Sequence, residues 1–203
     1  MKETREHIIG LADGLIRSKG FNAFSYSNIA GIMDVRNAAI HYHFPAKSDL
    51  GIAVIDKELE EMAHFKRDWD NLRGDEQLKR LMQRFYGGCE KGVICLTGAF
   101  TSGYATFPFP LQKRVQEMCR AILDWMTDCL EKGKAEGSLQ FQGDAYDRAL
   151  LVMSSLLSSL LLSRVLGQGT FDRMMTQQLK DLGSSPRIWT PGRIWLDDLD
   201  KDE

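Results

Sequence analysis

The chain has 203 residues, of which 43% are hydrophobic and 27% charged, and its formal net charge is −2. This composition is typical of a soluble globular protein and excludes a disordered or fibrous chain. Because the chain as a whole does not attract polyanions, any binding to nucleic acid must come from a local basic surface.

The N-terminal residues 1–7 mix acids with bases and lack the apolar core of a signal peptide, so export is not expected. The most apolar stretch, residues 149–162, contains four serines. It is shorter than the roughly 20 apolar residues that a bilayer span takes. The sequence therefore predicts a cytoplasmic protein without a membrane span.

The first 33 residues predict two helices. Apolar residues recur at helical spacing over residues 4–19, and Gly20 is placed to end this helix in a left-handed turn. Ser25 is a suitable cap for a short second helix, from Tyr26 to about Met33. The side of this second helix that faces the first is expected to carry Ile29 and Ile32 or Met33.

A third short helix is predicted from about Asn37 to His43. A turn at residues 34–35 precedes it, and the proline in residues 44–46 ends it. The residues expected to lock the second and third helices together are Ile29, Ala30, Val35 and Ile40. Three helices thus fit into fewer than fifty residues.

Helical patterns continue to residue 182, and no alternating strand pattern occurs, so the fold class is all-α. Long helices are expected over residues 47–72, 75–91, 111–134 and 144–166, with shorter ones within 96–110, which two prolines end, and over 171–182. Residues 144–166 are apolar nearly all round, so this helix must be covered on more than one side. The expected domains are residues 1–46, residues 47–182 and a tail, 183–203.

Residues 25–43 have the plan of a helix-turn-helix, in which the second helix presents an exposed face to the major groove of DNA. The outward residues of that helix are expected to be Asn37, Ala38, Ala39, His41 and Tyr42. The small alanines permit close approach to bases, where a methyl group can contact a thymine.

Two runs in this region resemble the N-terminal signature of TetR-family transcriptional regulators: residues 25–30, Ser-Tyr-Ser-Asn-Ile-Ala, and residues 35–50, from Val35 to Leu50. The resemblance covers about residues 4–55. It departs from the family pattern at Asp34, where glycine is usual, and at Arg36, where a serine or threonine cap is usual. Aspartate tolerates the left-handed conformation better than most residues. Without the usual cap, Asn37 or water would have to cap the third helix.

The resemblance implies a set of DNA-binding residues, a homodimer and a near-palindromic double-stranded operator. By position, DNA contacts are implied for Tyr26, Ser27, Arg36, Asn37, Ala38, Ala39, His41, Tyr42, His43 and Lys47. Among them, Tyr42, His43 and Lys47 would grip phosphates. Repression is the usual outcome in the family, with release by a small-molecule effector.

The resemblance also assigns effector binding and dimerisation to the larger helical domain. The helices over residues 111–134 and 144–166 are expected to form a four-helix bundle with their copies in a second subunit. Candidate effector-binding residues are Phe85, Phe100, Tyr104, Trp125 and Met126. Apolar and aromatic walls suit an apolar or aromatic ligand, although the same residues at helical spacing also suit a plain core.

Other functions are weighed against this interpretation. The four cysteines lack C-x-x-C spacing and are expected to be reduced core residues, but Cys89 and Cys95 flank a glycine-containing bend and would react if exposed. A thiol- or metal-responsive regulator on the same fold and a helical interaction module without DNA binding are therefore the alternatives. His41 and His43 point to different faces of a helix, so no metal site or cofactor is predicted. No catalytic motif indicates an enzyme.

Overall fold

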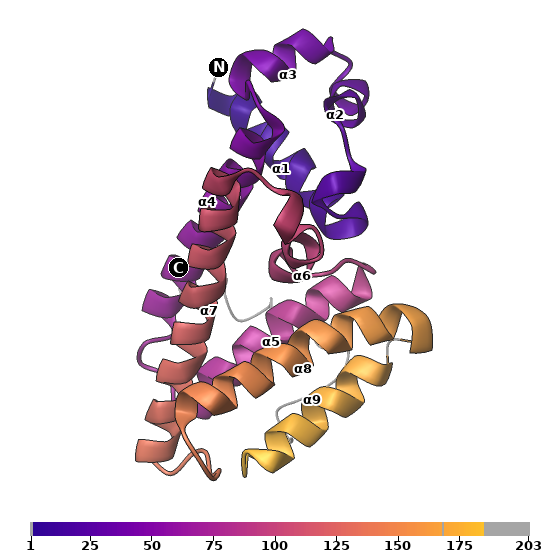
Figure 1. The fold of residues 1–203 in the computed structure, drawn as a ribbon. Coiled ribbons are helices and arrows are strands. Elements are labelled where there is room, and N and C mark those ends of the chain that lie inside the picture. Colours follow the sequence, from indigo (N-terminus) through magenta and orange to yellow (C-terminus); the bar gives the residue numbers. More distant parts are fainter. Residues whose placement is uncertain (1, 168, 185–203) are drawn as a thin grey trace, which may run out of the picture. The chain divides into compact units, whose positions relative to one another are not determined.

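The computed structural model describes residues 2–167 and 169–184, and within these ranges all regular structure is helical (Figure 1). The elements in chain order are α1 (Lys2–Lys19), η1 (Phe21–Ala23), α2 (Tyr26–Met33), α3 (Asn37–His43), α4 (Lys47–Asp68), α5 (Gly74–Glu90), α6 (Leu96–Thr101), η2 (Tyr104–Thr106), α7 (Phe109–Ala135), α8 (Ala145–Leu166) and α9 (Gly169–Asp181). The prediction of an all-α fold is confirmed. Residues 185–203 of the expected tail lie outside the described residues.

Helices α2 and α3 have the predicted bounds, whereas several other helices differ by a few residues. Helix α4 ends at Asp68 rather than at residue 72, and α7 begins at Phe109 rather than at Leu111. The expected break at Pro110 is wrong because this proline lies in the first turn of α7. There a missing N–H costs no hydrogen bond, since the first amides of a helix have no partner within it.

The described chain forms two compact units. One contains the residues up to Asp68 together with Ile94–Ile122, and the other contains Trp69–Val93 and the residues from Leu123 on. Helix α4 belongs to the same unit as the three N-terminal helices, and the expected domain boundary at residue 46 stays a prediction. The assignment of DNA binding to residues 1–46 stays a prediction.

The core of the first unit is an aromatic cluster around Phe21. Its ring centroid lies 5.9 Å from that of Phe24, 5.2 Å from that of Phe100 and 5.1 Å from that of Phe107. Gly51 of α4 lets this ring approach, because a Cβ there would lie only 2.7 Å from Phe21 Cε2. The cluster thus joins η1 to α4 and to the segment around α6.

A polar link holds the C-terminal end of α1. The Arg17 guanidinium bonds Asp13 at 2.8 Å and Glu58 of α4 at 2.5 Å, and the Arg17 carbonyl accepts the N–H of Ile94 at 3.1 Å. Helix α1 is therefore fixed by both α4 and the residues that lead into α6. The i,i+4 spacing of Asp13 and Arg17 is visible in the sequence, but the pairing of Arg17 with Glu58 is not.

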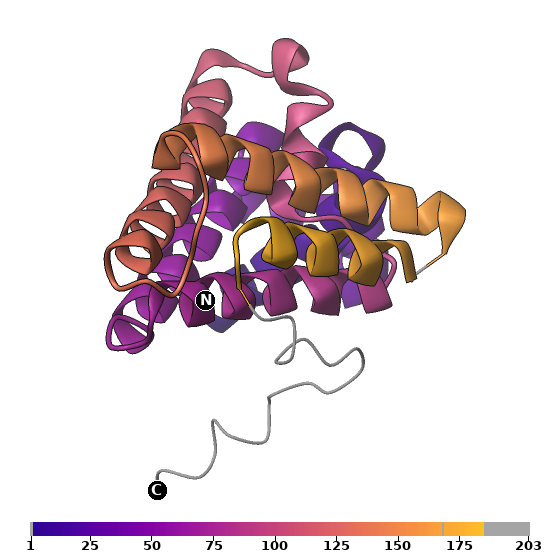
Figure 2. The ribbon, with the colours of Figure 1, turned by 90° about the horizontal axis from the view of Figure 1, so that it is seen from below.

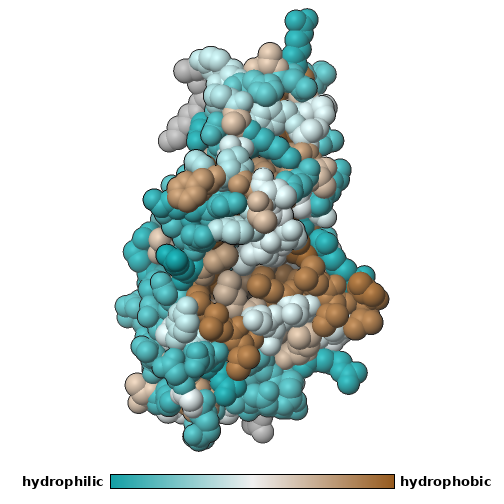
Figure 3. Space-filling view, viewed as in Figure 1, coloured by the Kyte–Doolittle hydropathy of each residue, from teal (hydrophilic) through white to brown (hydrophobic). Residues whose placement is uncertain are grey.

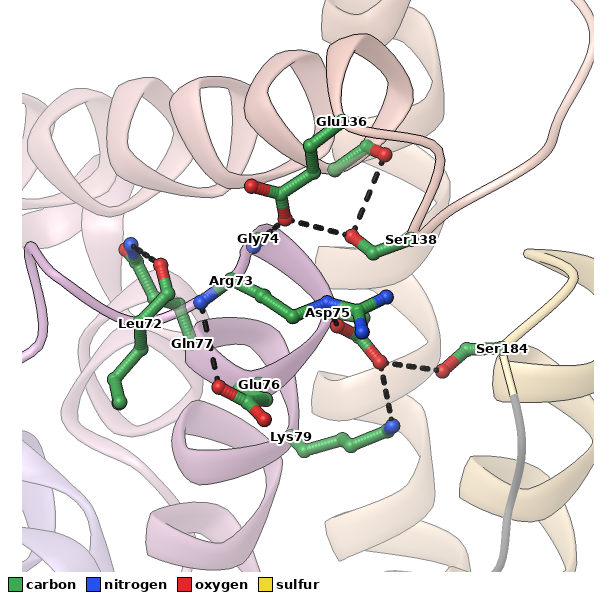
Figure 4. Close-up of polar contacts among 11 residues, drawn as sticks. Leu72, Arg73, Gly74, Asp75, Glu76, Gln77, Lys79, Glu136, Ser138 and Ser184 are labelled. Carbon is green, nitrogen blue, oxygen red and sulfur yellow. Dashed lines mark hydrogen bonds and ion pairs between the residues drawn. The ribbon is translucent and has the colours of Figure 1, made fainter.

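In the second unit, α5 begins in close contact with the backbone of α7 (Figure 4). A Cβ at Gly74 would lie 2.3 Å from the carbonyl oxygen of Cys129, and the Gly74 N–H donates to Glu136 Oε1 at 2.6 Å. Asp75 Oδ2 accepts from Lys79 Nζ at 2.7 Å and from Ser184 Oγ at 3.2 Å. Burial opposes the charged form, but the bond and charge of Lys79 keep the pKa of Asp75 below its usual value.

Helix α8 is buried along one side only. It lies beside α9 in both views (Figures 1 and 2) and also contacts α5, and the buried residues are Ala145, Ala149, Val152, Leu156, Ser159, Leu160 and Ser163. Figure 3 shows apolar side chains gathered at the surface over this helix. Its large exposed apolar residues are Tyr146, Leu150, Leu151, Leu161, Leu162, Val165 and Leu166.

By length and apolar composition alone, α8 would be able to cross a membrane, and about a third of its most apolar window is buried. The sequence prediction considered only the 14 residues from Ala149 to Leu162, whereas the helix has 22. Because its regularly spaced buried residues pack on α5 and α9, α8 is in part a core helix of its unit.

Candidate nucleic-acid interface

The turn between α2 and α3 is tight and left-handed. Asp34 has φ 53° and ψ 47°, and the N–H of Val35 returns to the carbonyl of Ala30 at 3.0 Å. Aspartate can adopt this conformation at modest cost, so the departure from glycine leaves the motif intact. At the start of α2, the N–H of Ser25 donates to Asn28 Oδ1 at 2.8 Å. The two helices are thus set by local hydrogen bonds.

Three of the four residues expected to lock the helices together are buried, namely Ile29, Ala30 and Ile40. Val35 is 40% exposed, so the expectation that it faces inward is wrong. Of the alternatives Ile32 and Met33, Ile32 is 59% exposed and Met33 is half-buried, so Met33 is the one that fits the prediction. The left-handed residue at position 34 redirects the chain, so the helical spacing that would turn Val35 inward does not extend past α2.

Helix α3 turns most of its side chains outward. Apart from the buried Ile40, every residue from Asn37 to Tyr42 is exposed, and His43 is half-buried. Arg36, which precedes the helix, is exposed and provides no side-chain cap. Asn37, named as a substitute cap, is the first residue of the helix. This surface combines hydrogen-bonding groups with two small alanines, as reading a groove requires.

Tyr26 is not part of that surface, contrary to the prediction. It is only 7% exposed, and its hydroxyl donates to the carbonyl oxygen of Phe44 at 2.8 Å. The residue therefore joins the start of α2 to the end of α3 as a brace. Its neighbour Ser27 is exposed, and its Oγ lies 2.6 Å from Ser25 Oγ.

The aromatic residues at the end of α3 are held by ring contacts. The His41 ring lies edge-on to that of Tyr26, with centroids 4.7 Å apart, and Nδ1 lies 3.4 Å from the Pro45 carbonyl oxygen. Tyr42 is 73% exposed, and its ring contacts that of His43 at 5.3 Å. Both Tyr42 and His43 are thus positioned at the end of α3 with polar groups that can meet a phosphate.

Lys47 begins α4 and lies over two rings of the aromatic cluster. Its ammonium nitrogen is 4.3 Å from the Phe24 ring centroid and 4.8 Å from that of Phe21. The side chain is half-buried, and this burial lowers its pKa. The aromatic faces hold the cation at the start of a helix, where free amides also favour an anion.

One basic residue of this region was not predicted. Arg5 of α1 is exposed, and its guanidinium lies 5.0 Å from the ring centroid of Phe44, the residue that ends α3. With Arg36 and Lys47 it is one of the cations of the helix-turn-helix region, on a chain whose net charge is negative. A cation one turn into the N-terminal helix is a weak signal without knowledge of where Phe44 lies.

The candidate effector residues are divided between the two units, and their role stays a prediction. Phe100 and Tyr104 belong to the first unit, where Phe100 is fully buried against Phe21 and the Tyr104 hydroxyl accepts from Gln116. Phe100 is therefore a core residue of that unit. The second unit contains the other three candidates, of which Phe85 is half-buried and Trp125 and Met126 are buried.

All four cysteines are free thiols, with Cys89 and Cys129 buried and Cys95 and Cys119 half-buried. Burial raises the pKa of Cys95 to about 11 and that of Cys119 above its usual value. In the described residues no group of three or more histidines, cysteines and acids is placed to hold a metal ion.

Two short helices joined by a left-handed turn, with the second helix facing outward, define a helix-turn-helix protein. No family model matches the chain. Solved structures do: a TetR-family transcriptional regulator from Agrobacterium tumefaciens is 28% identical and has a TM-score of 0.83, over 89% of this chain and 98% of the other. A TetR transcriptional regulator from Legionella pneumophila is 27% identical, with a TM-score of 0.74 over 86% and 96%.

A curated relative, the HTH-type transcriptional repressor NemR of Escherichia coli strain K12, is 19% identical over 169 residues. The match covers 80% of this chain and 85% of the repressor. The helix-turn-helix geometry and the agreement along nearly the whole length of the solved regulators show that the chain is similar to TetR-family transcriptional regulators.

Proposed function

We propose that the protein is a cytoplasmic transcriptional repressor that binds a near-palindromic DNA operator as a homodimer and is released by a small-molecule effector. The observation that carries the proposal is the outward face of α3, whose exposed Asn37, His41 and Tyr42 stand on a helix fixed by the buried Ile40. Ser27, Arg36, the two alanines, His43 and Lys47 complete the proposed DNA-binding surface.

The exposed leucines of α8 support the homodimer. A contiguous apolar face on a soluble protein marks an interaction site, and a second copy of the same helix offers a matching face. The sequence prediction paired α7 with α8 in a four-helix bundle. The exposed residues of α7 are mostly charged, whereas α8 carries exposed apolar residues. We therefore expect α8 to supply the main contact of the proposed dimer.

Two recognition helices in one dimer can enter successive major grooves, about 34–36 Å apart or a multiple of this. If the dimer has two spacings of its recognition helices, an effector that binds one of them more tightly shifts the population toward that spacing. Effector binding would thus change the affinity for an operator without touching the DNA surface.

For the effector, Trp125 is the candidate with the most support. Its indole N–H is buried and has no acceptor among the described residues, although its ring contacts that of Trp69 in a tilted arrangement, with centroids 5.7 Å apart. A buried donor without a partner is costly, about 1–3 kcal/mol. A mainly apolar ligand with one acceptor for this N–H fits the observation.

A thiol sensor is less well supported by the same geometry. Reaction requires the thiolate, and burial holds Cys95 in its neutral form at physiological pH. Cys89, on the other side of the bend, is buried.

The direct test is selection of bound fragments from random DNA with the purified full-length protein, followed by affinity measurements at several salt concentrations. A repressor of this type should enrich an inverted repeat, and its affinity should fall steeply as salt rises, because phosphate contacts release counterions. Enrichment of no sequence, or affinity independent of salt, would contradict the proposal and favour a helical interaction module.

A further inference from the structure

A cavity of about 330 Å³ lies within the second unit, apart from the helix-turn-helix. Its volume is near the lower end of the range for small-molecule sites, roughly 300–1,000 Å³. Two segments far apart in the sequence line it: the end of α5 with the turn after it, and the last turns of α8. The lining residues are Cys89, Glu90, Lys91, Gly92, Val93, Leu160, Ser163 and Arg164.

The first wall is a turn closed by its own hydrogen bonds. The N–H of Gly92 donates to the carbonyl of Cys89 at 3.0 Å, and the N–H of Val93 donates to the carbonyl of Gly88 at 3.0 Å. Gly92 has φ +65°, which an L residue rarely adopts, and only open space surrounds the position of a Cβ. The amides of the turn are thus already used, so side chains must recognise any ligand.

The second wall is the α8 side of the cavity. Leu160 and Ser163 are buried, and the Ser163 hydroxyl donates to the carbonyl of Ser159 at 2.6 Å. That hydroxyl can therefore only accept a further hydrogen bond. Leu160 and the half-buried Val93 give the cavity an apolar surface, as does the buried Cys89.

The remaining lining residues are ionisable and exposed. Lys91 and Arg164 contribute two positive charges and Glu90 one negative charge, so the formal charge of the lining is positive. Both cations are donors only, and an arginine fork matches the two oxygens of a carboxylate or the oxygens of a phosphate. An apolar surface with a cationic edge suits an amphipathic anion better than a neutral or cationic ligand.

We propose that this cavity binds an organic anion whose apolar body lies against Cys89, Val93 and Leu160 and whose anionic group pairs with Lys91 and Arg164. The volume suits a one- or two-ring body or a short chain. Calling such an anion an effector rests on the proposed repressor function, whereas binding itself does not. The cavity lies between the end of α5 and α8, so a bound ligand would contact the same helix that carries the apolar face.

The test compares two probes of one shape, 2-naphthoate and its neutral analogue 2-naphthamide, by isothermal titration with the full-length protein in the absence of DNA. The naphthoate should bind saturably and about fivefold more tightly than the amide, in line with the free energy of one ion pair near a surface. In NMR spectra the amide resonances of Gly92 and Val93 should shift on addition of naphthoate. Equal affinity for the two probes, or no saturable naphthoate binding at millimolar concentration, would overturn the proposal.

Variants locate the site. Lys91→Gln and Arg164→Gln should each weaken naphthoate binding by about threefold to fivefold and leave the amide unchanged. Arg173→Gln is the matched control, because Arg173 is an exposed arginine of α9 outside the lining. Val93→Trp, which places an indole in the cavity and keeps both cations, should weaken binding of both probes, with circular dichroism to verify folding. Unchanged naphthoate affinity in all three lining variants would place the binding elsewhere and sink the proposal.

The two proposals can fail separately. If the protein selects an inverted repeat from random DNA but binds no naphthoate, the repressor function stands and the cavity proposal is wrong. If naphthoate binds as expected and no DNA is selected, the site is real and the protein is not the proposed repressor.

Discussion

Helices α3 and α8 both present an exposed face, yet the two faces have opposite chemistry. On α3 the exposed residues are polar, aromatic with a polar group, or as small as alanine, whereas on α8 they are mostly large apolar residues. A polar face with small residues can lie in a DNA groove, where donors and acceptors decide the fit. Exposure of an apolar face to water is unfavourable, and burying that face against another apolar face lowers the free energy. Exposure alone therefore says little, and the side chains decide which partner covers each helix.

The largest effect is expected from a charge placed on the α8 face. In Leu151→Glu, dimerisation would bury a carboxylate without a partner, at a cost of about 3 kcal/mol or more. The dimer dissociation constant should rise by about 100-fold, as measured by sedimentation velocity over a range of concentrations. Arg173→Glu, an exposed change on α9, is the control and should leave the dimer intact. A dimer of wild-type affinity in Leu151→Glu would assign the α8 face to another partner.

The next effect tests whether α3 reads bases. Asn37→Ala should lose about 1–3 kcal/mol at one base pair of each half-site and leave the affinity for other sequences nearly unchanged. Selection from random DNA with the variant would then show relaxed preference at that position alone. A uniform loss on every sequence would mean that Asn37 contacts the backbone instead.

The two helices also differ in how far the sequence determined them. The bounds of α2 and α3 were predictable because a serine, an aspartate and a proline mark them locally. The exposure of Val35 and the burial of Tyr26 were not, since both depend on the direction of the chain after Asp34. For α8, the apolar character was visible in the sequence, but which leucines remain exposed depends on where α5 and α9 pack. The cavity beside Arg164 joins segments about seventy residues apart, so no local pattern could predict it.

A smaller effect should distinguish phosphate contacts from base contacts. Lys47→Met keeps an apolar stem on Phe21 and Phe24 but removes the charge. Binding should weaken by about tenfold on all sequences, and the dependence of log affinity on log salt should fall by about one unit of slope. Lys57→Met changes an exposed lysine of the same helix and should have little effect. Unchanged affinity in Lys47→Met would remove Lys47 from the DNA surface.

The smallest effect concerns Tyr26, which is expected to support α3 without contacting DNA itself. Tyr26→Phe loses the hydrogen bond to the Phe44 carbonyl, so the free energy of unfolding should fall by about 1 kcal/mol while base preference stays the same. Burial, with a contribution from the charge of Asp49, raises the pKa of Tyr26 from 10.0 to about 12. The folded chain thus retains a proton that the unfolded chain loses, and stability declines between these pH values.

Denaturant unfolding of the wild type and Tyr26→Phe across this alkaline range would measure the difference. The gap between the two proteins should be constant below pH 10 and should narrow as the pH approaches 12, because only the wild type carries the titrating phenol. A gap that does not change with pH, or an altered base preference in Tyr26→Phe, would contradict the assignment of this tyrosine as a brace. An altered base preference would mean that the Tyr26 hydroxyl gives up its hydrogen bond to the Phe44 carbonyl and contacts DNA.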